Sequence, residues 1–227
     1  MSHTTIQENT ARYLSEIANL VKEAGHPVEL LAATKTRNKE EIQSVIEAGV
    51  TLVGENKADE LCRKYEENAY AGASLHFIGT LQSNKAKYLV GKADLIHSLC
   101  TESAAEAIER VAARKGLVQE VLVEVHSGTE ETKSGIPPER VEEFLRYLKA
   151  FPHVKVRGLM TVAPVGEDPT PYFRAARALF DALRDAYSLD ILSMGMTADY
   201  KEAILAGATM VRIGSGLFGP RDYTQSK

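Results

Sequence analysis

Short apolar runs alternate with longer amphipathic segments along nearly the whole chain. Eight runs rich in Val, Ile and Leu have the length of strands, and several are apolar on both faces, as expected where helices cover a parallel sheet. Between them, apolar positions recur at intervals of three and four residues, which predicts helices. We predict strands at residues 28–33, 51–55, 75–79, 95–98, 120–125, 154–160, 191–195 and 209–214.

A first amphipathic stretch, from about Ile6 to Lys22, precedes the first predicted strand. Gly49, Gly116 and Gly207 each follow a later amphipathic run and suit helix C-termini. The later predicted helices that the pattern supports most clearly lie at 39–49, 101–116, 138–150 and 170–187.

This order of elements predicts an α/β fold, a TIM-type (β/α)8 barrel with an extra N-terminal helix. An open doubly wound sheet is the main competing architecture. The chain lacks GxGxxG after its first strand, however, and no long polar linker divides it into halves. We expect one domain over 1–227, with the N-terminal helix at about 1–25, the barrel at 26–221 and a tail at 222–227.

Composition and charge narrow the function classes. The 227 residues are 44% hydrophobic and 26% charged, enough for one large core. The 31 acidic and 27 basic residues give a formal charge of −4 without a Lys/Arg block, so a nucleic-acid partner is not expected. Because the polar start lacks a signal-peptide pattern and no apolar run nears the roughly 20 residues of a membrane span, we expect a cytoplasmic protein without a membrane partner.

The two cysteines, Cys62 and Cys100, lie far apart and in neither a CxxC pair nor a zinc spacing. We interpret them as reduced thiols without a catalytic role, consistent with a reducing compartment. No metal site is expected.

Candidate chemistry gathers at the carboxyl ends of the predicted strands, where barrels of this type place their reactive groups. Lys35 ends the first strand, and alternation puts it on the face of Leu31 and Ala33. If that face lines the barrel, burial disfavours the charged lysine and exposes the lone pair that attacks an aldehyde. A lysine that only extends to water at a strand end is the ordinary alternative.

The last two strand ends combine glycines with hydroxyl residues. Gly195 and Gly214 let backbone N–H groups approach an anion, and Thr197 and Ser215 can add hydroxyl donors. Each turn alone is usually only a turn or a helix cap, but two on adjacent strands indicate a phosphate site. Arg212 lies in an apolar stretch of the last strand, where its guanidinium needs a ligand, an acceptor or an ion-pair partner.

Seven motifs occur in order along the chain: AATKT at 32–36, GEN at 54–56, HFIGTLQSNK at 76–85, TKSGI at 132–136, RGLM at 157–160, LSMGM at 192–196 and MVRIGSGLFGPR at 210–221. With them the chain resembles, over nearly its entire length, the pyridoxal phosphate homeostasis proteins, whose barrel is similar to the N-terminal domain of alanine racemases. It departs from that pattern at Lys57-Ala58-Asp59, where Val-Gln is more usual, and at Cys100, where aspartate is common.

The resemblance implies that the protein binds pyridoxal 5′-phosphate (PLP) as an internal aldimine on Lys35. It implies that Thr197, Gly214 and Ser215 hold the phosphate, and that Arg212 approaches the pyridine nitrogen. Three further residues are expected to line the cofactor: Asn56, His76 and Met194.

An arginine beside the pyridine nitrogen opposes its protonation and weakens the electron sink that carbanion chemistry uses. Alanine racemases also take a second acid/base, a tyrosine, from an additional β domain across the dimer, and this chain ends shortly after GLFGPR. We therefore expect a monomeric PLP carrier without robust turnover, which passes the cofactor to apo-enzymes or free amines. The alternatives are a small racemase or amino-acid lyase, and a phosphate-sugar enzyme that forms a Schiff base on Lys35.

Overall fold

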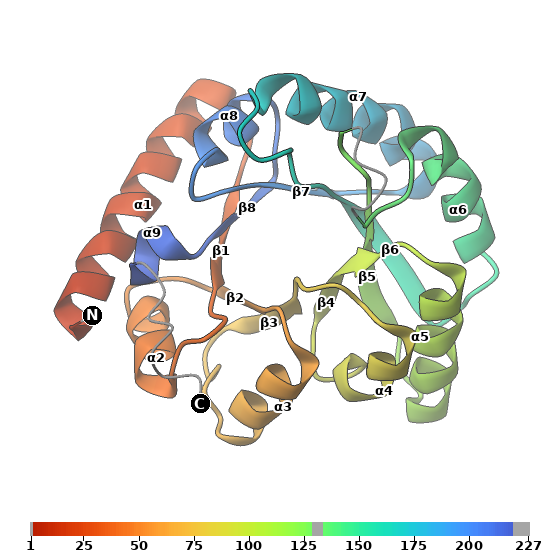
Figure 1. The fold of residues 1–227 in the computed structure, drawn as a ribbon, viewed down its shortest axis with the longest axis horizontal. Helices are drawn as coiled ribbons and strands as arrows, with labels where there is room; N and C mark the ends of the chain where they lie inside the picture. Colours follow the sequence, from red (N-terminus) through yellow and green to blue (C-terminus); the bar gives the residue numbers. More distant parts are fainter. Residues whose placement is uncertain (1, 129–133, 220–227) are drawn as a thin grey trace.

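Eight parallel strands close into a barrel in the order of the sequence in the computed structural model of the chain (Figure 1). The structure describes residues 2–128 and 134–219. The predicted TIM-type barrel is confirmed, and the predicted strand bounds agree with the observed ones to within two residues. The strands are β1 Glu29–Ala33, β2 Leu52–Glu55, β3 Ser74–Phe77, β4 Leu95–Leu99, β5 Gln119–Glu124, β6 Val154–Met160, β7 Ile191–Met196 and β8 Met210–Ile213.

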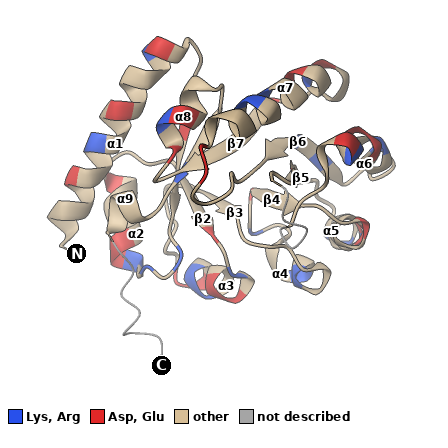
Figure 2. Cartoon of the chain, turned by 45° about the horizontal axis from the view of Figure 1, so that its top comes forward, with Lys and Arg blue, Asp and Glu red and all other residues tan. Residues whose placement is uncertain are grey.

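Helices surround the barrel, and those described include α1 His3–Ala24, α2 Lys39–Glu47, α3 Ala58–Glu66, α4 Ala86–Leu89, α5 Glu102–Lys115, α6 Val141–Leu148, α7 Thr170–Tyr187, α8 Tyr200–Leu205 and α9 Ser215–Phe218. Short 3-10 turns, η1 Ser83–Lys85 and η2 Pro138–Arg140, precede α4 and α6. Basic and acidic residues mix on α1, α3, α6 and α7 (Figure 2). Within the described ranges, no helix is both long and apolar enough to cross a membrane.

The N-terminal helix α1 completes the outer ring of helices. Helix α9 is only a single turn. Helix α1 contacts α2, α8 and α9 and covers this side of the barrel (Figure 1). Its buried apolar face includes Ile6, Tyr13 and Ile17. The helix begins earlier than expected, since Ser2 caps it by accepting a hydrogen bond from the backbone N–H of Thr5 at 3.3 Å.

Strand alternation divides the apolar core. Side chains such as Ala32 and Val211 face outward and pack in the large cluster beneath the helices. Two small clusters fill part of the barrel interior: Leu31, Leu52 and Met210, and Leu95, Leu122 and Met160. The interior also holds four buried polar side chains: His76, His97, Ser193 and Arg212. Buried polar groups are costly unless they are paired, so they mark the region where a site is expected.

Three parts of the sequence expectations fall outside the described residues: residues 132 and 133 of the TKSGI motif, residues 220 and 221 of the last motif, and the tail at 222–227. The assignment of 1–227 to a single domain stays a prediction.

Candidate functional site

A cavity of about 380 Å³ opens at the carboxyl-terminal mouth of the barrel, between the turn after β1 and the ends of β7 and β8. Six of the eight residues predicted for the site line it: Lys35, Asn56, Thr197, Arg212, Gly214 and Ser215. The lining also includes residues that sequence reasoning missed, among them Arg37, Ile78, Met160 and Met196.

Lys35 had been expected to end the first strand, but it lies in a turn beyond β1. The strand ends at Ala33, and the backbone N–H of Arg37 then donates to the carbonyl of Thr34 at 3.1 Å, which closes the turn. Within it, Thr36 has φ +65°, a left-handed conformation that β-branched residues rarely adopt. The half-buried Lys35 side chain still lines the barrel mouth.

The two glycine-hydroxyl turns after β7 and β8 meet. The backbone N–H groups of Gly214 and Gly216 donate to Thr197 Oγ1 at 3.3 and 3.5 Å. Gly195 has φ +89°, and a Cβ at this position would overlap the Cβ of Ala203. Glycine therefore lets α8 approach the end of β7 and brings Thr197 to the cavity.

Arg212 projects from β8 into the barrel and is 6% exposed. Its guanidinium donates to Ser193 Oγ at 2.7 Å and to the carbonyl oxygen of Thr161 at 3.1 Å. Both acceptors are uncharged, so these contacts differ from the buried ion pair that was the ordinary alternative. Burial lowers the pKa of Arg212 to about 10, which leaves the guanidinium charged at neutral pH.

His76 does not line the cavity but lies inside the barrel. Its Nδ1 is 3.0 Å from Nε2 of His97, whose own Nδ1 is 3.2 Å from Ser193 Oγ. Burial lowers the pKa of His76 to about 4 and that of His97 well below its usual value, so both rings are neutral at neutral pH. The polar chain ends on Arg212, while Ile78, two residues beyond His76, lines the cavity.

Met194 faces away from the cavity, and the structure does not place it among the residues that line it. It is fully buried in the core beneath the helices, because the neighbouring Ser193 points into the barrel and alternation sends Met194 outward. Met196 reaches the cavity instead, since the β7–β8 register shifts between Ser193 and Met196. The polar residue Ser193 is the feature of the sequence that could have indicated the outward orientation of Met194.

Asn56 follows β2 and lines the cavity. Its Oδ1 is buried and has no hydrogen-bond partner among the described residues. An unpaired buried acceptor costs free energy that a polar ligand group would recover. The backbone here is also closely fitted, because the Asn56 carbonyl occupies the space that a Cβ on Gly79 would need.

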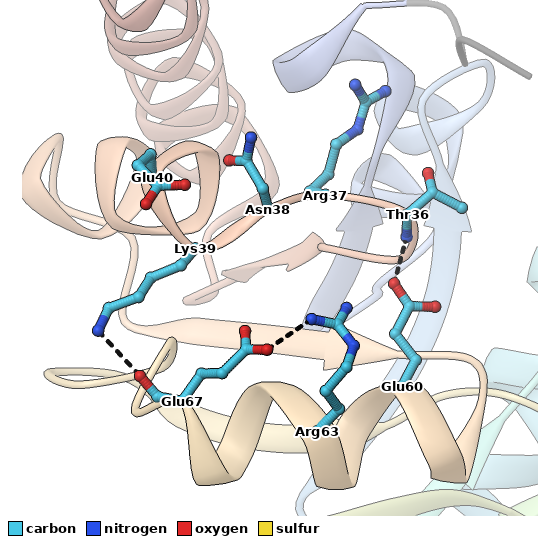
Figure 3. Close-up of a pocket in the computed structure, with 8 residues that line it drawn as sticks. All are labelled: Thr36, Arg37, Asn38, Lys39, Glu40, Glu60, Arg63 and Glu67. Carbon is cyan, nitrogen blue, oxygen red and sulfur yellow. Dashed lines mark hydrogen bonds and ion pairs between the residues drawn. The ribbon is translucent and has the colours of Figure 1, made fainter. Parts of the chain in front are cut away.

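A second hollow, of about 510 Å³, lies between the turn after β1 and helix α3 (Figure 3). Its polar groups pair with one another: the N–H of Thr36 donates to Glu60 at 2.7 Å, and Arg63 pairs with Glu67 at 2.8 Å. It is larger than the barrel cavity, but it contains none of the predicted site residues. Arg37 borders both. We therefore interpret this hollow as part of the structure that supports the turn after β1 and not as the candidate site.

Known proteins resemble this chain in sequence and fold. Residues 9–222 match the family of alanine racemase N-terminal domains. A pyridoxal phosphate homeostasis protein of Aquifex aeolicus (strain VF5) is 44% identical over 224 residues, which cover 95% of this chain and 98% of that protein. The structure of PipY from Synechococcus elongatus PCC7942 with PLP bound matches with a TM-score of 0.82 and 30% identity, over 94% of this chain and 100% of PipY. A Clostridium difficile 630 alanine racemase, with a TM-score of 0.73 and 18% identity over 96% of this chain and 61% of its own, shows the shared fold alone.

Proposed function

The chain belongs to the pyridoxal phosphate homeostasis proteins and matches the alanine racemase N-terminal domain family, and from that premise we propose that it binds PLP in the barrel cavity as a Schiff base on Lys35. One observation carries the proposal: Lys35 and the paired turns at Thr197 and Gly214 line one and the same cavity. An amine and an anion site thus lie within reach of one small molecule.

The cavity suits this cofactor in size and in chemistry. Its volume of about 380 Å³ lies within the range of about 300–1,000 Å³ that is usual for small-molecule sites. A Cβ on Gly214 would meet only ordinary contacts, the nearest being Ala33 Cβ at 3.5 Å, so the backbone there is open. Asn56 offers an unsatisfied polar atom, and Ile78 and Met160 give the apolar walls that an aromatic ring needs.

Each residue then has a defined task. The hydroxyls of Thr197 and Ser215 and the backbone N–H of Gly214 donate hydrogen bonds to the phosphate. Arg212, held by uncharged acceptors, keeps its positive charge beside the ring nitrogen and opposes protonation of that nitrogen. PLP supplies an aldehyde, which the Lys35 amine captures reversibly with release of one water.

The residues that accompany Lys35 in the cavity support a carrier role. Among the described residues that line the cavity there is no carboxylate, imidazole, phenol or thiol to act as a second acid/base. Two-base racemisation would need such a group, whereas exchange of the cofactor needs only an incoming amine. We therefore propose storage of PLP and its release to apo-enzymes or free amines. A monomeric state and a cytoplasmic location remain predictions.

Trapping the Schiff base tests the assignment of Lys35. Borohydride reduction of the PLP-loaded protein should add the reduced cofactor to the peptide that contains Lys35, as detected by mass spectrometry. Lys35→Ala should lose this adduct and retain weaker, noncovalent binding. Lys39→Ala, which removes an exposed lysine in α2, is the matched control and should keep the adduct. An adduct on another lysine would refute the assignment.

The phosphate site is tested by removing its hydroxyl groups one at a time. Thr197→Ala and Ser215→Ala should each weaken PLP binding roughly tenfold or more, because a charge-assisted hydrogen bond contributes about 1.5–3 kcal/mol. Thr197→Ser keeps the hydroxyl and should bind nearly as well as the native chain. Unchanged dissociation constants in both alanine variants would contradict the phosphate site.

Turnover separates the carrier from the enzyme. The PLP-loaded protein should reactivate an apo-enzyme that requires PLP and should show little turnover of alanine, serine or threonine. Robust multiple-turnover racemase or lyase activity, absent in Lys35→Ala, would favour the enzyme alternative.

A further inference from the structure

Three charged side chains, two buried and one partly exposed, form a network behind the turn that carries Lys35. Lys64 in α3 is 1% exposed, and Glu55 at the end of β2 is 0% exposed. The ammonium of Lys64 lies 2.7 Å from Glu55 Oε1 and 2.7 Å from Glu60 Oε1, and it donates to the carbonyl of Thr34 at 2.8 Å. The three N–H donors of this lysine therefore have three acceptors.

The network holds the residues on both sides of Lys35. On one side, Thr34 donates its hydroxyl to Glu55 Oε1 at 2.7 Å, while its carbonyl accepts from Lys64. On the other side, the N–H of Thr36 donates to Glu60 Oε1 at 2.7 Å (Figure 3). The neighbours of Lys35 in the sequence are thus both fixed to one cluster.

The turn needs this support because Thr36 is strained. A β-branched residue at φ +65° persists only where its surroundings over-determine the backbone. Glu60 supplies such a constraint, because it accepts the hydrogen bond of that residue's own N–H.

Stability alone is a weak reason for these charges. Lys64 follows Ala58 and Leu61 at three-residue spacing on the buried face of α3, where an apolar side chain would pack without loss of hydration. None of the three charged residues belongs to the described lining of the cavity. The network therefore contacts the turn and does not line the barrel cavity.

We propose that Lys64 and Glu60 are positioning residues that hold the turn so that the amine of Lys35 is presented to the aldehyde of PLP. The inference rests on the proposed function. Capture forms a bond between Nζ and the aldehyde carbon and releases one water, so its equilibrium depends on where the amine is held. The phosphate turns belong to β7 and β8, and noncovalent binding should not depend on the network.

Two ligands separate these contributions. Pyridoxamine 5′-phosphate has the ring and phosphate of PLP but carries an amine in place of the aldehyde, so it cannot be captured. The ratio of the two dissociation constants, measured by equilibrium dialysis, therefore reports covalent capture. Glu60→Ala should reduce the preference for PLP about tenfold, as expected when one charge-assisted hydrogen bond that holds the turn is lost. Its affinity for pyridoxamine 5′-phosphate should stay within about twofold of the native value.

Matched variants decide the result. Glu60→Gln keeps an oxygen that accepts from Thr36 and should retain most of the preference. Glu66→Ala, on the same helix and 76% exposed, should behave as the native chain. An unchanged preference in Glu60→Ala, or an equal loss for both ligands, overturns the positioning role. If Glu60→Ala does not fold, it is combined with Thr36→Gly, since glycine adopts this φ without strain and keeps the N–H that Glu60 accepts. The double variant should prefer PLP less than Thr36→Gly alone, and an equal preference in the two would overturn the positioning role.

Failure of the proposed function is recognised separately. If the native chain shows neither a preference for PLP nor a borohydride adduct on Lys35, the proposed function fails, and this inference with it. If the native chain captures PLP and Glu60→Ala captures it equally well, only the positioning role is wrong.

Discussion

Replacing Lys64 by methionine is the most direct test of the buried network. Methionine has a similar length but donates no hydrogen bond. The change removes three hydrogen bonds of 2.7, 2.7 and 2.8 Å, two of them to carboxylates, from a side chain that is 1% exposed. The Glu55 carboxyl group would then lie in the protein interior without a cation to pair with its charged form.

The expected loss of stability follows from that unpaired charge. Removing one partner of a buried ion pair usually costs about 3–5 kcal/mol. Glu55 Oε1 would keep donors from Thr34 at 2.7 Å and Tyr70 at 3.2 Å, so the lower part of that range applies. We expect Lys64→Met to lower the free energy of unfolding by about 3–4 kcal/mol and the Tm by about 10 °C for a chain of this length.

The loss should depend on pH in a defined direction. Burial raises the pKa of Glu55 above 4.5 even with Lys64 present. A raised folded-state pKa stabilises the fold fully below the unfolded-state pKa, and this stabilisation is lost as pH rises through the folded-state pKa. Without Lys64 the pKa of Glu55 should rise further, so the deficit should be largest at about pH 8 and shrink towards about pH 5.

Urea unfolding monitored by circular dichroism at several pH values measures both effects. Lys64→Met combined with Glu55→Gln removes the unpaired charge and should recover most of the loss. Lys92→Met is the control, because that lysine is 28% exposed and pairs with Glu66 only at 3.8 Å, and it should cost less than about 1 kcal/mol. A loss below about 1 kcal/mol in Lys64→Met, or one independent of pH, would refute the reasoning.

Three further outcomes are expected. Gly195→Ala should lower the free energy of unfolding by about 3 kcal/mol, because its Cβ would overlap Ala203, whereas Gly166→Ala, at a similar φ but in open space, should lose only about 1 kcal/mol in urea titrations; equal losses would contradict the steric argument. Burial lowers the pKa of His76 from 6.5 to about 4, so between these pH values the unfolded chain binds a proton that the folded chain does not, and stability falls as pH decreases. The free energy of unfolding of His76→Gln should decline less steeply over the same pH range, and an identical slope would contradict this role of His76. Burial raises the pKa of Cys100, so at about pH 8 its thiol should react with iodoacetamide more slowly than the thiol of glutathione does. Mass spectrometry measures both rates, and equal rates would contradict this prediction.

The sequence by itself determined the barrel and much of the candidate site. Apolar spacing reflects local geometry, with a period of two in strands and 3.6 in helices, so the strands could be placed to within two residues of their observed bounds. Parallel strands in a barrel bring their carboxyl ends to one mouth, which is why Lys35, Thr197 and Gly214 could be assigned to one site before any contact was known.

Only the tertiary structure decided the finer arrangement. The register shift in β7 gave the cavity Met196 instead of Met194, and a bulge of this kind depends on the neighbouring strand. The positive φ of Thr36 is imposed by the contacts of the turn and not by its own preference. Lys64 reads in the sequence as one polar residue on an amphipathic helix, because its partner Glu55 lies on another element. The two charges meet only when α3 packs against the end of β2, and a pairing between distant segments is set by that packing, which local spacing does not encode.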